Sequence, residues 1–244
     1  MTQVVSSPSG MLRHAAAIAW KDLRVELRSK EIATTTVFFA VMVVLISTFA
    51  YVEKEEVVSL SPLVVVQRVF GDPAAAILWI ALTFSGMLGL GRAFEREREH
   101  DTLRALLLAP IDRAAIFLGK ATGVTASVLL VAAVVVPLVG LFYQAPIGRG
   151  VGILILLIVL ATIGFAVVGS TFAAMLLRAR MREVLLPVLV YPILVPALIA
   201  GAKGTTGLWS GLDEVAWFWT KFLLVYDAIF IAVALWAFES LVVE

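Results

Sequence analysis

Six long apolar segments dominate this chain of 244 residues. A helix needs about 20 largely apolar residues to cross the hydrocarbon core of a bilayer. The segments meet that length or come close to it, so the sequence predicts an all-α integral membrane protein with six transmembrane helices. The expected spans are about 32–52, 73–91, 121–142, 151–177, 184–202 and 222–238.

The composition agrees with a bilayer as the main solvent. The chain is 61% hydrophobic and only 15% charged, so it has more apolar surface than one soluble core buries. A net charge of +1 gives no overall field that would indicate nucleic acid as a partner. Because the chain has no cysteine, disulfides and thiolate metal sites are excluded. Residues 1–30 lack the continuous apolar region of a signal peptide, and we expect the first span to be retained.

The distribution of basic residues predicts the orientation. Of the 19 Lys and Arg residues, fourteen lie in the N-terminal segment and in the second-to-third and fourth-to-fifth connections, and five lie on the other side. Basic residues concentrate in cytoplasmic loops. We therefore expect both termini and these connections in the cytoplasm. Residues 1–10 are expected to form a disordered tail, and residues 11–244 a single six-span domain.

The segment before the first span has helical periodicity. Its apolar residues on one face are Leu12, Ala16, Trp20, Leu23 and Leu27, while the basic residues lie elsewhere. This pattern predicts a helix that lies in the cytoplasmic interface of the membrane. The alternative is an unstructured, merely basic tail.

The connection between the second and third spans begins with seven consecutive ionisable residues. Opposite charges stand three residues apart in the pairs Glu95–Arg98, Arg96–Glu99 and Arg98–Asp101. Such pairs favour a helix. An apolar stripe then follows at Leu103, Leu106, Leu107 and Ile111, and Pro110 ends or kinks the helix. The pattern over 95–111 is suited to docking on a soluble cytoplasmic partner. The alternative is a solvated loop whose leucines lie on lipid headgroups.

A nucleotide site in this connection can be excluded. Gly119-Lys120 looks like the end of a phosphate-binding loop, but Ala114 replaces the earlier glycine and Ala121 replaces the hydroxyl residue. Any ATP must therefore be hydrolysed by another chain.

These residues carry a family resemblance. The run Glu97-Arg98-Glu99, Thr102-Leu103, Leu106-Leu107, Ala109-Pro110 and Gly119-Lys120 resembles the coupling segment of type-2 ABC permeases, which rests on an ATPase subunit. More narrowly, LWIALTFSGMLGLGRAFERERE, LLPVLVYPILVPALIAGAKGT and YDAIFIAVALWAFE look like the CcmB family, the haem exporter permeases of cytochrome c maturation. The resemblance covers about residues 11–244. One departure is His100-Asp101, where relatives often have a glycine before the Thr-Leu pair.

The resemblance implies a multi-pass subunit of the bacterial inner membrane with a type-2 ABC permease fold. It implies partners: a cytoplasmic ATPase, haem-handling membrane subunits, a periplasmic haem chaperone and a second permease copy. ATP hydrolysis would drive haem export, or release of the haem-loaded chaperone. The alternative is a type-2 ABC permease for a lipid, polysaccharide or drug. The residues that would couple to the ATPase are Glu95, Arg96, Glu97, Arg98, Glu99, Asp101, Thr102, Leu103, Leu106, Leu107 and Pro110.

The fifth and sixth spans offer candidates for a transport path or hinge. Pro187, Pro192 and Pro196 remove backbone donors, so we expect a kinked or broken helix near Tyr191. Simple kinking is the alternative to a transport role. Asp227 is an acid inside a span, five or six residues from its expected outer boundary. A bare carboxylate there costs about 2.5 kcal/mol or more, so it should face protein, water or a cation such as Lys221, or be protonated.

Aromatic residues and histidines complete the candidates. Trp209, Trp217 and Trp219 are expected at the outer interface, as a membrane anchor or, alternatively, as a haem-stacking surface. Both histidines, His14 and His100, fall on the cytoplasmic side. We therefore expect no metal site and no stable haem binding by this chain alone. With no acidic or histidine partner for Asp227 in the spans, we also expect no catalytic residue.

Overall fold

The computed structural model describes residues 8–58, 73–99, 113–176, 179 and 181–241. Seven helices make up nearly all of this part of the chain. They are α1 (Pro8–Ser29), α2 (Glu31–Val58), α4 (Pro73–Glu99), α6 (Arg113–Tyr143), α7 (Val151–Met175), α8 (Arg182–Ser210) and α9 (Asp213–Leu241). The predicted all-α fold is confirmed.

Six of these helices are long and apolar enough to cross a membrane, which confirms the predicted number of spans. The apolar windows are Ala33–Ala50, Pro73–Glu95, Ala114–Tyr143, Val151–Met175, Glu183–Ser210 and Asp213–Ala237. A helix suits a bilayer because it satisfies its backbone groups internally. The largest difference from the expected spans is at α9, which begins at Asp213 and not near residue 222.

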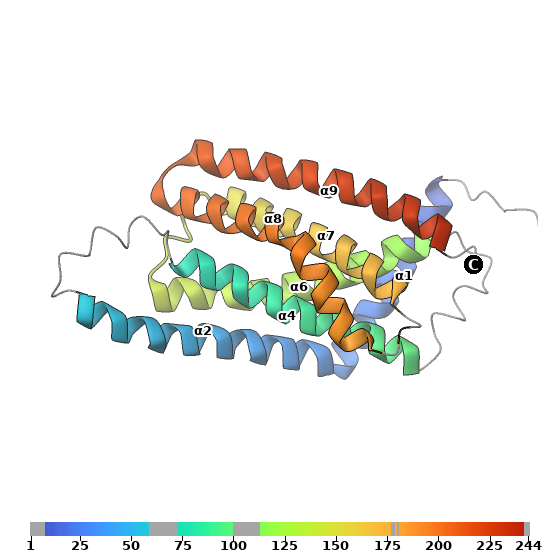
Figure 1. Ribbon diagram of the computed structural model, residues 1–244, viewed down its shortest axis with the longest axis horizontal. Coiled ribbons are helices and arrows are strands. Elements are labelled where there is room, and N and C mark those ends of the chain that lie inside the picture. The colour runs from blue at the N-terminus through green and yellow to red at the C-terminus, as the bar shows by residue number, and fades with distance from the viewer. Residues whose placement is uncertain (1–7, 59–72, 100–112, 177–178, 180, 242–244) are drawn as a thin grey trace, which may run out of the picture.

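The six long helices run side by side along the length of the molecule (Figure 1). In this view α2, α4 and α6 form the lower part and α7 and α9 the upper part, while α8 runs from the upper part on the left to the lower part on the right. α4 packs against α2, α6, α7 and α8, while α9 packs chiefly against α7 and α8. The largest buried cluster includes Leu78, Val135, Leu157 and Leu223, one each from α4, α6, α7 and α9. α4 therefore lies at the centre of the bundle.

The N-terminal helix lies at the end of the bundle where α9 ends (Figure 1). α1 and α2 are separate helices because Lys30 between them has a left-handed backbone (φ 55), which ends α1. The carbonyl of Lys30 then accepts the amide N–H of Thr34 at 2.9 Å and begins α2. The first span thus follows directly from a helix that packs on the bundle end.

The predicted apolar face of α1 is not the face that packs on the protein. Ala15 and Ile18 are buried, whereas Ala16 is exposed and Trp20 is 60% exposed. The guanidinium of Arg24 lies 5.8 Å from the centroid of the Trp20 ring. α1 therefore docks on the bundle through Ala15 and Ile18 and leaves Ala16 and Trp20 exposed, with a cation near the Trp20 ring. Such a face suits the headgroup region of a membrane.

Candidate functional site

The predicted coupling segment lies only partly in the described chain. Its first residues, Glu95 to Glu99, form the last turns of α4 and not a separate helix. Glu95 is exposed, and one turn earlier the Arg92 guanidinium donates a hydrogen bond to the Thr35 hydroxyl of α2 at 3.1 Å. The remaining coupling residues, Asp101, Thr102, Leu103, Leu106, Leu107 and Pro110, lie outside the described residues.

The pair Gly119-Lys120 has a structural explanation. Both residues are in α6, a regular helix, and not in a phosphate-binding loop. A Cβ atom added to Gly119 would lie 2.8 Å from the Cβ of Ile18 and 2.9 Å from the carbonyl oxygen of Ala15. Glycine is therefore the residue that lets α1 cross α6 at close range. This crossing lies six residues beyond the start of α6 at Arg113, immediately after the predicted docking segment.

The proline-rich fifth span forms one helix, α8, with Pro187, Pro192 and Pro196 inside it. The expectation of a kinked or broken helix is therefore correct only for the kink: α8 changes direction along its length but stays helical (Figure 1). Tyr191 is half-buried, and its ring centroid lies 5.5 Å from that of Phe84 on α4. The proline-rich part of α8 thus contacts α4.

Tyr226 of α9 is hydrogen-bonded to α8. The Tyr226 hydroxyl donates a hydrogen bond of 2.9 Å to the carbonyl oxygen of Ile193, three residues before Pro196. Pro196 lacks the N–H that would donate to the Pro192 carbonyl in a regular helix, and the Ile193 carbonyl is the next one along the chain. The Tyr226 ring also packs on Phe230, with centroids 4.5 Å apart. Tyr226 therefore links α9 to the proline-rich part of α8.

Asp227 follows directly and faces a different helix. Its side chain is 5% exposed. A Cβ atom added to Gly164 of α7 would lie 2.5 Å from the Asp227 Oδ1 atom. Since α9 begins at Asp213, Asp227 is fourteen residues into a helix that ends at Leu241. The expected distance of five or six residues from the outer boundary was counted from a span that begins near residue 222, whereas the helix itself begins nine residues earlier, at Asp213.

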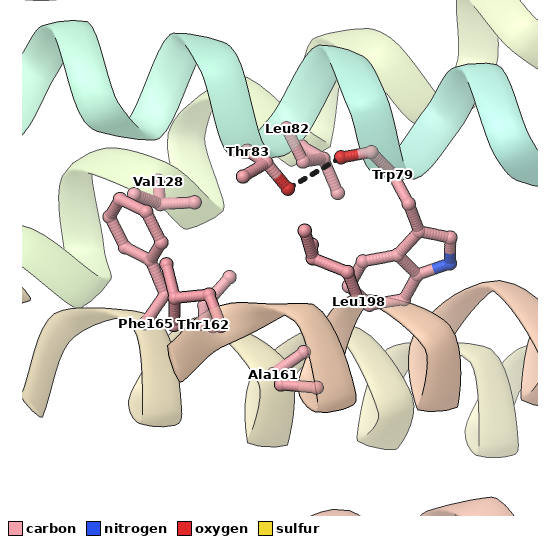
Figure 2. Close-up of a pocket in the computed structure, with 10 residues that line it drawn as sticks. Trp79, Leu82, Thr83, Val128, Ala161, Thr162, Phe165 and Leu198 are labelled. Atoms are coloured by element: carbon pink, nitrogen blue, oxygen red, sulfur yellow. Dashed lines mark hydrogen bonds between the residues drawn. The ribbon is translucent and has the colours of Figure 1, made fainter. Parts of the chain in front are cut away.

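A small cavity lies between α4, α6, α7 and α8 (Figure 2). Its volume of about 20 Å³ holds about one water molecule. Two threonines line it, but each hydroxyl donates to its own helix: Thr83 to the carbonyl of Trp79 at 2.7 Å and Thr162 to that of Val159 at 2.9 Å. A macrocycle such as haem does not fit in this cavity.

The three tryptophans expected at the outer interface divide into two groups. Trp217 is 46% exposed, and Trp219 is half-buried with the Lys203 Nζ atom 5.5 Å from its ring centroid. Trp209, however, is only 6% exposed, so its expected contact with headgroups is wrong. Trp209 belongs instead to the largest buried cluster, close to the turn at Gly211 (φ 86) that ends α8.

Histidine does not approach the centre of the bundle in the described chain. His14 is exposed on α1, and His100 lies outside the described residues. Within the ranges that the structure describes, His, Cys, Asp and Glu do not gather in groups of three or more that could hold a metal ion.

Two contacts between the helices were not predicted from the sequence. Tyr226 stands beside Asp227 in the sequence, and a polar pair inside an apolar span was the available signal. The second contact is at Trp79, whose indole Nε1 donates to the Thr205 hydroxyl at 3.0 Å and whose ring packs on Gly201. Sequence spacing gives no indication of a contact between residues so distant in the chain.

Comparison with known proteins agrees with this architecture. The model of the family described as CcmB protein matches residues 13–243. A protein named Heme exporter protein B from Pseudomonas aeruginosa is 25% identical over 187 residues, which are 77% of this chain and 78% of that protein. Proteins of the same name from Rhodobacter capsulatus and Paracoccus denitrificans are 33% and 31% identical. Those two matches cover 55% and 58% of this chain and 63% and 65% of the relatives.

The family match includes α2 to α9 and most of α1. It therefore covers the bent helix, the Tyr226 and Asp227 contacts and the predicted docking segment together. The chain belongs to the CcmB protein family.

Proposed function

We propose that this chain is the membrane subunit of a haem exporter complex in the bacterial inner membrane. It couples ATP hydrolysis by a partner ATPase to work on haem or on the periplasmic chaperone that carries haem. The observation that carries the proposal is the family match over residues 13–243, together with relatives named Heme exporter protein B. Six apolar helices supply the membrane part that such a subunit needs.

The arrangement of α4 supports the coupling role. This helix extends without an interior proline from Pro73 through the first charged residues of the docking segment to Glu99. It packs against α2, α6, α7 and α8. A displacement of the cytoplasmic end of α4 by an ATPase would therefore act on four other helices. The same segment leads directly to the start of α6, where α1 also docks.

Of the two forms of this function, we favour the one in which another subunit holds the haem and haem does not pass through this chain. The cavity between α4, α6, α7 and α8 has room for about one water molecule, and His14 is exposed on α1, the helix at the end of the bundle. Both observations favour ATP-driven release of a haem-loaded chaperone over passage of haem through this chain. The complex then contains the ATPase, two permease copies, haem-handling membrane subunits and the periplasmic chaperone.

The orientation can be tested by cysteine labelling, because the chain has no cysteine. We expect His14→Cys and Met181→Cys to react with an impermeant maleimide only from the cytoplasm, since they lie on the side with fourteen basic residues. Arg149→Cys and Leu212→Cys should react only from outside. All four side chains are exposed. Outside labelling at Met181→Cys would contradict the six-span topology.

The function is tested with the complete complex in lipid vesicles. With the ATPase and the haem-handling subunits present, ATP should release the haem-loaded chaperone, and an ATPase without its catalytic base should not. The purified chain alone should show neither ATPase activity nor stoichiometric haem binding. Haem that crosses the bilayer without the chaperone would contradict the release form. ATPase activity that responds to a lipid or drug, and not to the chaperone, would contradict haem work altogether.

A further inference from the structure

Asp227 has no counter-charge bonded to it within the described chain. Both carboxyl oxygens of Asp227 are buried and have no hydrogen-bond partner among the described residues. The nearest hydroxyl in sequence, that of Tyr226, is already donated to the Ile193 carbonyl. Lys221, the cation expected from the sequence, is exposed and lies elsewhere on α9. The carboxyl therefore lies in the middle of a span without a donor from this part of the chain.

The helices packed on α9 do not supply a cation either. α9 packs against α7, α8 and α6. α7 has no ionisable residue at all. The ionisable residues of the other two are Arg182, Glu183, Tyr191 and Lys203 on α8, and Arg113, Lys120 and Tyr143 on α6. None of them is hydrogen-bonded to an Asp227 oxygen.

The described surroundings of Asp227 also lack the ligands of a metal site. A carboxylate ligand to a metal ion needs further ligands around the ion, and His, Cys, Asp and Glu do not gather near Asp227 in the described chain. Gly164 is so close that even a methyl group there would overlap the Asp227 Oδ1 atom. A charge that is buried without a partner is costly, and a carboxyl group avoids that cost by taking up a proton.

We propose that Asp227 is an intramembrane proton-binding site, which holds a proton while α9 is packed against Gly164 of α7 and releases it when these helices separate and water enters. The site does not depend on which cargo the complex serves. Because the packed state holds the proton, raising the pH should favour separation of α7 and α9 and lowering it should favour their packing.

Infrared spectroscopy of the chain in lipid bilayers tests the proton directly. Near neutral pH, the wild type should show the carbonyl band of a protonated carboxylic acid, and Asp227→Asn should lack it. Asp213→Asn is the matched control, because Asp213 is an exposed acid of the same helix; it should lose carboxylate absorbance only. Loss of carboxylate absorbance in Asp227→Asn, with no acid band in the wild type, would overturn the proposal.

The link between proton and packing has two further tests. Gly164→Ala should push α9 away from α7, so that the acid band converts to carboxylate at lower pH than in the wild type. An unchanged titration in a folded Gly164→Ala chain would overturn the link. A second measurement needs no change at Gly164: as pH rises, the Tm of the wild type should fall relative to that of Asp227→Asn, which cannot ionise. Parallel Tm curves would equally reject the link.

Discussion

Replacing Leu106 and Leu107 together by alanine should abolish co-purification of the partner ATPase. If both side chains fill a cleft on the ATPase, each contributes about 1.5 to 3 kcal/mol of buried apolar contact. Since about 1.4 kcal/mol is a tenfold change in affinity, the double variant should bind at least a hundredfold more weakly. The loss should persist at low salt, because the contact is apolar. Recovery of the ATPase with each tagged variant measures it.

Two controls separate docking from other effects. Leu108→Ala removes a leucine that is not part of the stripe predicted from the sequence at Leu103, Leu106, Leu107 and Ile111, and it should leave recovery unchanged. Charge reversal at Glu97 and Glu99 should weaken the complex little, because exposed ion pairs contribute about 0 to 1 kcal/mol and are screened by salt. Undiminished recovery with Leu106→Ala and Leu107→Ala would instead support a stripe that lies on lipid headgroups.

The sequence predicts the spans of this CcmB-family chain well because length and hydropathy determine them. All six apolar windows overlap the expected spans, although the third begins at Ala114 and not at 121, and the fifth ends at Ser210 and not at 202. The sixth was placed too late, since Asp213, Glu214, Lys221 and the tryptophans resemble a connection. In the structure these residues form the first turns of α9, and the apolar window of that helix begins at Asp213. Charge marks where a helix leaves lipid, but it does not mark where the helix begins.

The contacts of the candidate site were not predictable in the same way. Periodicity identifies a face of a helix, but not the helix that this face meets. The Tyr226 hydroxyl on the Ile193 carbonyl and the Asp227 carboxyl on Gly164 both join residues that are far apart in the sequence. Each depends on how α7, α8 and α9 pack. The sequence indicates an unusual acid at 227, and only the fold gives its surroundings.

Two glycines, Gly91 and Gly119, also show that the sequence does not indicate which residues lie next to each other. In the sequence, Gly119 belongs to a pair that only resembles the end of a phosphate-binding loop, and Gly91 is the last residue of the expected second span. In the structure, the two glycines differ in the atoms that surround them. No atom lies within 4 Å of the position of a Cβ atom at Gly91, whereas at Gly119 the neighbours are the Cβ of Ile18 and the backbone of Ala15. Neither neighbour at Gly119 is the end of a flexible side chain.

The same substitution at these two glycines should therefore have opposite effects. Gly91→Ala should stabilise the chain by up to about 1 kcal/mol, because alanine is the better helix former. Gly119→Ala should cost about 1 to 3 kcal/mol through overpacking, and the cost should fall on the docking of α1 on α6. Hydrogen exchange of the α1 amides should then accelerate by about tenfold for each 1.4 kcal/mol, while α7 amides exchange as before.

The assembled complex shows whether this docking matters for coupling. α1 contacts α6 close to the point where the docking segment enters it, so loosening α1 should let the start of α6 move without the rest of the bundle. Gly119→Ala should then bind the ATPase normally and yet release less chaperone per ATP hydrolysed, while Gly91→Ala behaves as wild type. Equal α1 exchange in both variants would mean that α1 does not depend on the Gly119 crossing, and the role assigned to that glycine would be wrong.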